Sequence, residues 1–381
     1  MTVQRPHSKP AKISVAEPDL GPDEKAALLE VIDSGWITMG EKVSSFEQEF
    51  ARSHGTADAV AVSSCTGGLH LVMHAFGFGA GDEVLVPALS FVATANCVLY
   101  VGATPVFVDI ESLDRPLMSL ADAERKCTVR TRAVILVHYA GHVWDRERWR
   151  AFAAARSLVL IEDAAHCAGL PEAGRLGHAA VFSFYGNKNM TTAEGGMIVA
   201  PDRALRERLR SMRGHGLTSG TFERHSAGLP GYDVIMLGFN YRMDELRAAI
   251  GLVQLKRLPA WNERRELLSR AYRTLLDESA PEVLVPFSDG GRSSHHIMPV
   301  LLPRGVSRPL VIETLRAAGI QTTIHYPAIH RMSFYAQRFP DVRLDVTDEY
   351  CGRELTLPLY PRLKDAEVRL VASTLAEAVR H

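Results

Sequence analysis

The chain has 381 residues, and its 43 lysines and arginines against 44 aspartates and glutamates give a formal charge of −1 at pH 7. This balance gives no reason to expect nucleic acid or an anionic membrane surface as a partner. With 46% hydrophobic and 23% charged residues, the composition is typical of a globular protein long enough for two domains.

The five cysteines are scattered and include no C-x-x-C pair, so neither a zinc site nor a disulfide framework is predicted. The first twenty residues lack the apolar core of a signal peptide, and no apolar run is long enough to span a bilayer. We therefore expect a reduced, cytoplasmic protein without a metal site.

After a polar N-terminal arm of about a dozen residues and a helix in "GPDEKAALLEVIDSG", short apolar strands alternate with helical stretches. The predicted strands lie in "ADAVAVSS", "DEVLVPA", "TPVFVDI", "RAVILVHYAG", "SLVLIEDAAH", "AAVFSFY" and "GGMIVA". Nearly continuous apolar residues are typical of strands buried on both faces. The alternation predicts an α/β fold with a mostly parallel sheet.

The pattern changes after Ala200. A charged helix in "DRALRERLRSMRG" precedes a loop rich in Gly, Ser and Pro at residues 215–233, and loops of that length are usually functional. A long helical stretch follows, with a predicted break near Pro259, and the remainder mixes short strands with helices. We place a large domain at residues 1–255 and a smaller α+β domain at residues 256–381.

Ligands of doubly wound sheets bind beyond the carboxyl ends of the strands, and three polar clusters of this sequence fall there. The first is "SSCTGGLH", residues 63–70, between a strand and a helix. Its small residues and the free N–H groups of a helix start suit a phosphate. An ordinary tight turn is the alternative. The nearby "GFGAGD" lacks the G-x-G-x-x-G spacing of a dinucleotide site.

The second cluster is "LVLIEDAAH", which puts Glu162, Asp163 and His166 at the end of an apolar strand. A buried carboxylate needs a partner, and a protonated heteroaromatic nitrogen is a suitable one. Capping of a following helix by Asp163 is an equally good explanation from the sequence alone.

The third cluster surrounds Lys188 in "FSFYGNKNMTTAEGGMIVA", after the hydroxyl of Ser183. An enclosed amine has a lowered pKa, which suits a nucleophile that forms a Schiff base, although a solvated loop lysine is the common case. Together, a phosphate cradle, a carboxylate for a ring nitrogen and an isolated lysine match the needs of pyridoxal phosphate. Phe91 is a candidate to stack on its ring, or a plain core residue.

Collinear blocks over nearly the whole chain resemble the DegT/DnrJ/EryC1/StrS family of sugar aminotransferases. They are "SGWITMGEKVSSFEQEFA", "GDEVLVPALSFVATANCVLYVGATPVFVDI", "IEDAAH", "FSFYGNKNMTTAEGGM", "GFNYRMDELRAAIGLVQL", "IHYPAIH" and "LTLPLYP". The resemblance implies the aspartate-aminotransferase-like fold (fold type I), with pyridoxal phosphate bound in the large domain.

By position, the resemblance implies that Lys188 forms the Schiff base, Asp163 pairs with the pyridinium nitrogen, His166 lies near the phenolic oxygen and Phe91 stacks on the ring. The positions implied to hold the phosphate are Thr66, Gly67, Ser183 and, from the neighbouring subunit, Asn240. An obligate homodimer with shared active sites follows from that last assignment. Arg242 and His325 match positions close to the substrate.

The implied reaction moves an amino group from glutamate to a keto sugar, most simply one linked to a nucleotide diphosphate. A keto-cyclitol acceptor and a non-catalytic regulatory or assembly protein are the alternatives. The second would be expected to lose Lys188 or Asp163, and relatives that dehydrate sugars have His in place of Lys188. The segments 213–215 and 224–225, with Arg and His, are candidates to face an anionic acceptor, or are solvated.

Three departures from the family pattern put the substrate, rather than the cofactor, in question. They are "SCTGGL" in the phosphate turn, "HVWDRERW" after "HYAG", and "ITMG". The acceptor, the carbon aminated and the pathway are left open by the sequence.

Overall fold

The computed structural model describes residues 12–143, 145–228 and 230–380, so most of the N-terminal arm lies outside the described residues. Its centre is a seven-stranded sheet in the order β1-β7-β6-β5-β4-β2-β3. The strands are β1 (Ala59–Val62), β2 (Glu83–Pro87), β3 (Thr104–Val108), β4 (Thr131–Val137), β5 (Val159–Asp163), β6 (Ala179–Ser183) and β7 (Gly196–Val199). Strands β2 to β6 pair in parallel, and β7 runs antiparallel to β1 and β6. The expected mostly parallel α/β sheet is confirmed.

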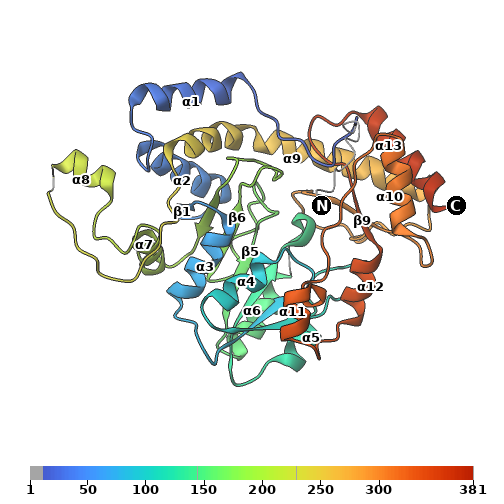
Figure 1. Ribbon diagram of the computed structural model, residues 1–381, viewed down its shortest axis with the longest axis horizontal. Coiled ribbons are helices and arrows are strands. Elements are labelled where there is room, and N and C mark those ends of the chain that lie inside the picture. The colour runs from blue at the N-terminus through green and yellow to red at the C-terminus, as the bar shows by residue number, and fades with distance from the viewer. Residues whose placement is uncertain (1–11, 144, 229, 381) are drawn as a thin grey trace, which may run out of the picture.

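Helices cover both faces of this sheet (Figure 1). Alternate residues of a strand point to opposite faces, so Val60 and Val62 pack in the core under α3, α4 and α7, whereas Ala59 and Ala61 pack under α2 and α9. The helices of the first part of the chain are α1 (Pro22–Ser34), α2 (Glu41–His54), α3 (Cys65–Ala75), α4 (Ala93–Tyr100), α5 (Leu120–Lys126), α6 (Arg146–Ala155), α7 (Arg203–Met212) and α8 (Thr221–Ala227).

The long helix α9 (Glu245–Ser279) is continuous through Pro259, so the predicted break near this residue is wrong. A proline removes one backbone hydrogen bond and crowds the preceding turn. Here the helix packs against α1, α2 and α13, and the flanking Leu258 and Trp261 are buried. Tertiary packing on both sides of Pro259 therefore holds the helix together.

The C-terminal part of the chain has its own small sheet, in which β8 (Met298–Leu301) runs antiparallel to β9 (Glu354–Leu357). Its helices are α10 (Arg308–Ala317), α11 (Ser333–Arg338), α12 (Asp345–Arg353) and α13 (Asp365–Val379). A separate hydrophobic core joins β8, β9, α10 and α13 to the second half of α9, and Ile13 packs into it. None of the described helices is both long and apolar enough to cross a membrane.

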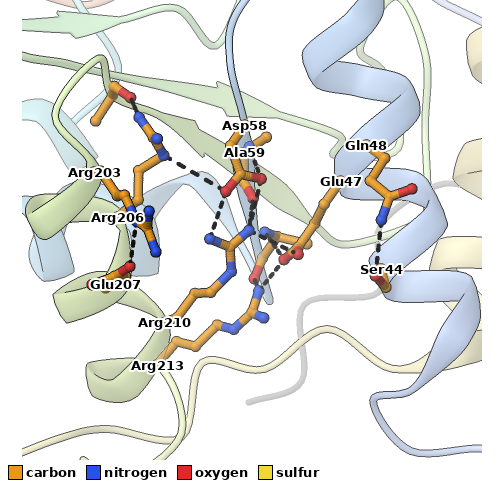
Figure 2. Close-up of polar contacts among 12 residues, drawn as sticks. Ser44, Glu47, Gln48, Asp58, Ala59, Arg203, Arg206, Glu207, Arg210 and Arg213 are labelled. Atoms are coloured by element: carbon orange, nitrogen blue, oxygen red, sulfur yellow. Dashed lines mark hydrogen bonds and ion pairs between the residues drawn. The ribbon is translucent and has the colours of Figure 1, made fainter.

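Figure 2 shows a partly buried ionic network that ties α7 to α2 and β1. Arg213, at the end of α7, donates to the Glu47 carboxylate and to Ala61 O, at 2.6 Å from the latter. Arg210 donates to Asp58 Oδ2 at 2.7 Å and to Glu47 Oε2 at 3.3 Å. Arg213 is therefore paired within the fold, and it also lines the hollow that contains Arg242.

Candidate active site

A cavity of about 460 Å³ opens at the carboxyl ends of the strands. It collects seven of the residues singled out from the sequence: Thr66, Phe91, Asp163, His166, Ser183, Lys188 and His325. They come from the ends of β5 and β6, from the segments that follow β1, β2, β5 and β6, and from the C-terminal part of the chain. The three polar clusters of the sequence thus meet at one place.

One end of the cavity is formed by the first turn of α3. Ser64 caps this helix and accepts from Gly67 N at 3.0 Å, while the N–H groups of Cys65 and Thr66 precede the first intrahelical hydrogen bond. The chain approaches closely here, because a Cβ on Gly196 would lie 2.7 Å from Cys65 N. Ser183, at the end of β6, lines the same cavity. Free N–H groups at a helix start and a nearby hydroxyl suit a phosphate.

Glu162 and Asp163 are neighbours with different environments, since consecutive strand residues point to opposite faces. Glu162 is fully buried, lies 2.8 Å from His138 Nε2 and accepts hydrogen bonds from three backbone N–H groups. The three donors are Gly174, Leu176 and Gly177. Its acceptor capacity is thus used within the fold, and of these two neighbours Asp163 is the one that lines the cavity.

Asp163 lies deep in the cavity, where its carboxylate is held by neutral donors. Its Oδ2 accepts from Thr94 Oγ1 at 2.7 Å, and its Oδ1 from Ala165 N at 3.2 Å. A turn follows the strand, so the alternative that Asp163 caps a helix is wrong. Burial raises the pKa of Asp163, against the opposing effects of Thr94 and Ala165. A carboxylate in this position is stabilised by a cation placed in the cavity.

Lys188 extends into the cavity from the turn after β6. Burial lowers the pKa of its amine to about 8. Its Nζ lies 3.3 Å from Nε2 of His296, a residue not singled out from the sequence. Asn189 donates from its Nδ2 to Asn262 Oδ1 and to Ser294 O, which leaves its Oδ1 as the acceptor from His296 Nδ1 at 2.8 Å. This arrangement assigns the proton of neutral His296 to Nδ1, so its Nε2 accepts from Lys188.

His166 and Tyr326 form the wall next to Lys188. His166 Nε2 lies 2.9 Å from Tyr326 OH, and its buried Nδ1 has no hydrogen-bond partner among the described residues. Burial lowers the pKa of His166 well below the ordinary value, so the ring is neutral. Phe91 is 58% exposed, with its ring 6.1 Å from that of Tyr326. It is thus not a core residue, and it lines the cavity.

The remaining predicted residues lie outside the cavity lining. Gly67 is buried in α3 just behind Thr66. Asn240 is exposed, and Arg242 lines a different hollow of about 300 Å³ between α7 and the segment that follows it. Among the described residues, no group of three or more His, Cys, Asp or Glu side chains is arranged to hold a metal ion.

These features fit pyridoxal phosphate. The first turn of α3 and Ser183 would hold its phosphate, the buried Asp163 its protonated ring nitrogen, and the orphaned His166 Nδ1 a further polar atom. The amine of Lys188, with its pKa lowered to about 8, suits a covalent link to a carbonyl. Fold and cavity thus define a pyridoxal-phosphate-dependent transferase of fold type I.

The chain belongs to the DegT/DnrJ/EryC1/StrS aminotransferase family, whose family model matches residues 18–376. It is therefore an aminotransferase with pyridoxal phosphate as its cofactor. Among similar solved structures is Helicobacter pylori PseC, an aminotransferase involved in the biosynthesis of pseudoaminic acid. The two chains share 29% identity at a TM-score of 0.91, over 97% of this chain and 99% of PseC.

Structures of two further proteins were solved with the cofactor or a product. Spr1654 of Streptococcus pneumoniae, 28% identical, is known in the pyridoxamine form, with a TM-score of 0.89 over 97% of this chain and 99% of that one. It is also known in the pyridoxal form. DesI, in the presence of its TDP-sugar product, is 32% identical with a TM-score of 0.86, over 97% of this chain and 93% of DesI.

Proposed function

We propose that the protein transfers an amino group from L-glutamate to a keto sugar carried on a nucleotide diphosphate. The observation that carries the proposal is the cavity itself, where the Lys188 amine and the buried Asp163 carboxylate lie at one carboxyl edge of the sheet. The nucleotide-linked acceptor is supported by DesI, whose structure was solved with a TDP-sugar product. The "HVWDRERW" and "ITMG" departures leave the sugar itself open.

The residues of the cavity have different roles in this transfer. Bound pyridoxal phosphate supplies an electron sink for the pair left when a C–H bond of the amino donor breaks. Asp163 would keep the ring nitrogen protonated, and the first turn of α3 and Ser183 would anchor the phosphate. Lys188 Nζ, once free, is the base that takes the proton from the donor's α-carbon. With a pKa of about 8, a larger fraction of this amine is unprotonated near neutral pH than for an ordinary lysine.

We further propose a homodimer whose active sites are completed by the partner's Asn240. Asn240 is exposed, and the segment that precedes it, residues 232–237, is largely exposed and apolar. Its large exposed side chains are Tyr232, Val234, Ile235 and Leu237. The adjoining helix α8 lies at the edge of the molecule (Figure 1), where Phe222 and His225 lie beside the ring of Trp36. A second copy that covers this surface would remove an apolar patch from water.

Mixed dimers test the shared site. Lys188→Ala and Asn240→Ala each damage both sites of their own homodimer. A dimer that contains one copy of each has one site with both changes and one site intact. We therefore expect activity to reappear when the two inactive or weakened variants are unfolded, mixed and refolded. If mixing restores no activity while each variant alone refolds, Asn240 acts within its own chain.

Two broader assignments belong to the same proposal. We assign residues 1–255 to the large cofactor-binding domain and 256–381 to the small domain, supported by the separate core around β8 and β9. We also propose a cytoplasmic location, supported by the five unpaired cysteines.

The substrate proposal is tested in two steps. Holoenzyme is first converted with glutamate, and the amino form is then offered nucleotide-linked keto sugars, free keto sugars and keto-cyclitols. Return of the pyridoxal absorbance with the nucleotide-linked sugars, and not with the free ones, supports the proposal. Return with a keto-cyclitol alone favours the alternative acceptor. If no ketone restores the absorbance, the keto acceptor is wrong.

A further inference from the structure

A chain of three polar side chains leads from the cavity into the C-terminal core. His325, which lines the cavity, has its Nδ1 3.0 Å from Thr356 Oγ1. Thr356 Oγ1 in turn donates to Glu354 Oε1 at 2.5 Å. Glu354 Oε2 accepts from His325 N at 2.9 Å, so the carboxyl also fixes the backbone of the histidine. Glu354 and Thr356 are buried at 0% and 1% exposure.

Glu354 has an unusual environment for a glutamate. The nearby guanidinium of Arg308 is bonded to the backbone carbonyls of Cys351 and Glu354, and no cation contacts the carboxylate among the described residues. The other titratable groups that face it are Tyr139, Tyr326, Tyr350, Cys351 and His325. Burial raises the pKa of Glu354 to about 8, against the opposing effect of Thr356. The carboxyl can therefore hold a proton near neutral pH.

His325 has a lowered pKa, in contrast to the raised pKa of Glu354. Burial and the nearby Lys188 lower the pKa of its imidazole to about 4, so an imidazolium is disfavoured beside the cavity. Uptake of a proton at its Nε2 therefore favours release of the proton on Nδ1. The hydroxyl of Thr356 connects Nδ1 to the carboxylate of Glu354, which can accept a proton near neutral pH.

We propose that His325, Thr356 and Glu354 form a proton relay between the cavity and the buried carboxyl. When Nε2 of His325 takes up a proton, the Nδ1 proton passes to Thr356 Oγ1, and the former hydroxyl proton of Thr356 passes to Glu354. The net change is one proton on Glu354 and a neutral His325 whose N–H has moved from Nδ1 to Nε2. The reverse sequence returns the proton to the cavity.

The relay predicts that the charge of Glu354 sets the tautomer of His325. An ionised Glu354 accepts from Thr356, which then accepts from Nδ1–H, so Nε2 carries a lone pair. A protonated Glu354 donates to Thr356, which then donates to Nδ1, so Nε2 carries the proton. His325 would thus act as an acid or a base on a bound substrate. That catalytic part rests on the proposed function, whereas the link between carboxyl and tautomer does not.

Glu354→Gln separates the two states. Because His325 N needs an acceptor, the amide oxygen of the introduced side chain faces it, and the amide nitrogen donates to Thr356. Thr356 must then donate to Nδ1, which locks the proton on Nε2 at every pH. Thr356→Val removes the hydroxyl that links His325 to Glu354, and Thr356→Ser is the matched control that keeps the hydroxyl. Thermal melting checks that each variant is folded.

The test is nitrogen NMR of the full-length, cofactor-free protein labelled with ¹⁵N-histidine. The signals of His325 among those of the 15 histidines are identified by their loss in His325→Gln. In the wild type and Thr356→Ser, we expect Nε2 of His325 to lose its proton as the pH rises through about 8. In Glu354→Gln it keeps the proton, and in Thr356→Val the step near pH 8 disappears. No tautomer change in the wild type, or the same change in Glu354→Gln, overturns the relay.

Holoenzyme gives the second readout. We expect Glu354→Gln to slow the reaction with glutamate roughly 100-fold, the lower end of general acid–base catalysis, and to flatten its dependence on pH near 8. Unchanged rates and an unchanged pH profile contradict a catalytic relay. If the NMR step is present but the wild type reacts with no amino donor, the relay stands and the proposed function fails.

Discussion

Nζ of Lys188 lies 3.3 Å from Nε2 of His296, and Asn189 fixes the His296 ring so that this nitrogen accepts a hydrogen bond. Burial and Lys188 hold the pKa of His296 well below its ordinary value, which keeps the ring neutral. The histidine thus orients the amine without adding a second charge to the cavity. It acts as a positioning residue for the lysine.

Replacement of His296 by leucine should slow the capture of pyridoxal phosphate by the cofactor-free protein. The loss of one hydrogen bond, about 1 kcal/mol, corresponds to roughly a fivefold slower reaction. The neighbouring His295 lies beside His142 instead, so His295→Gln is the matched control. Stopped-flow absorbance measures the rate. Equal rates for His296→Leu and the wild type would show that His296 does not position the amine.

The capture of pyridoxal phosphate should also depend on the protonation of Lys188. Because the pKa of the amine is lowered to about 8, the protein holds an ammonium below that pH and a free amine above it. Only the free amine attacks a carbonyl, so the capture rate should rise from pH 6 to about 8 and then level off. A rate that still climbs steeply towards pH 10 would mean that Lys188 is not desolvated.

The two adjacent carboxylates should respond in opposite ways to neutralisation. The folded-state pKa of Asp163 is raised, so the folded protein binds more protons than the unfolded chain, and this group destabilises the cofactor-free protein above its unfolded pKa. Asp163→Asn should therefore raise the melting temperature of the cofactor-free protein at pH 7 and weaken cofactor binding.

Glu162 has a lowered pKa, which follows from its hydrogen bond to His138 and from backbone N–H groups despite its burial. Its ionised form contributes stability above its unfolded pKa, and this contribution is lost as the pH falls through the folded-state pKa. Glu162→Gln should lower the melting temperature at pH 7. Calorimetry of both variants settles the comparison, and a lower melting temperature for Asp163→Asn would contradict the assigned roles.

The ionic network in Figure 2 should contribute to stability rather than to substrate binding. Arg213→Ala removes the closest partner of the buried Glu47 carboxylate, which keeps Arg210 and the Ala61 N–H, and we expect a loss of about 1–3 kcal/mol in the free energy of unfolding. Arg203, on the same helix, pairs with Glu207 at the surface, so Arg203→Ala should have a far smaller effect. Chemical denaturation measures both. A stable Arg213→Ala protein with impaired acceptor binding would reverse this assignment.

The central sheet could be predicted from the sequence because strands buried on both faces are continuous apolar runs, such as "AVILV" in β4. The same runs show where the strands end, and they therefore place Asp163 and Lys188 at the carboxyl edge of the sheet. The choice between Glu162 and Asp163 required the structure, since adjacent residues look alike in sequence and differ only in the face they occupy.

Other parts of the site depend on contacts between distant segments. His296 is 108 residues from Lys188 in the chain, and the doublet "HH" at residues 295–296 carries no local sign of which ring enters the cavity. Glu354 begins a strand of the C-terminal part, and only its burial beside Thr356 and His325 makes it unusual. The continuity of α9 through Pro259 also depends on the helices packed around it.

The absorption spectrum of the purified holoenzyme, before and after the addition of L-glutamate and with Lys188→Ala measured alongside, decides whether Lys188 carries the cofactor and glutamate donates the amino group. We expect a visible band of pyridoxal phosphate attached to Lys188, absent from the variant, and its replacement by the pyridoxamine absorbance when glutamate is added. A protein that binds no cofactor, or a band that persists in Lys188→Ala and ignores glutamate, would contradict this expectation.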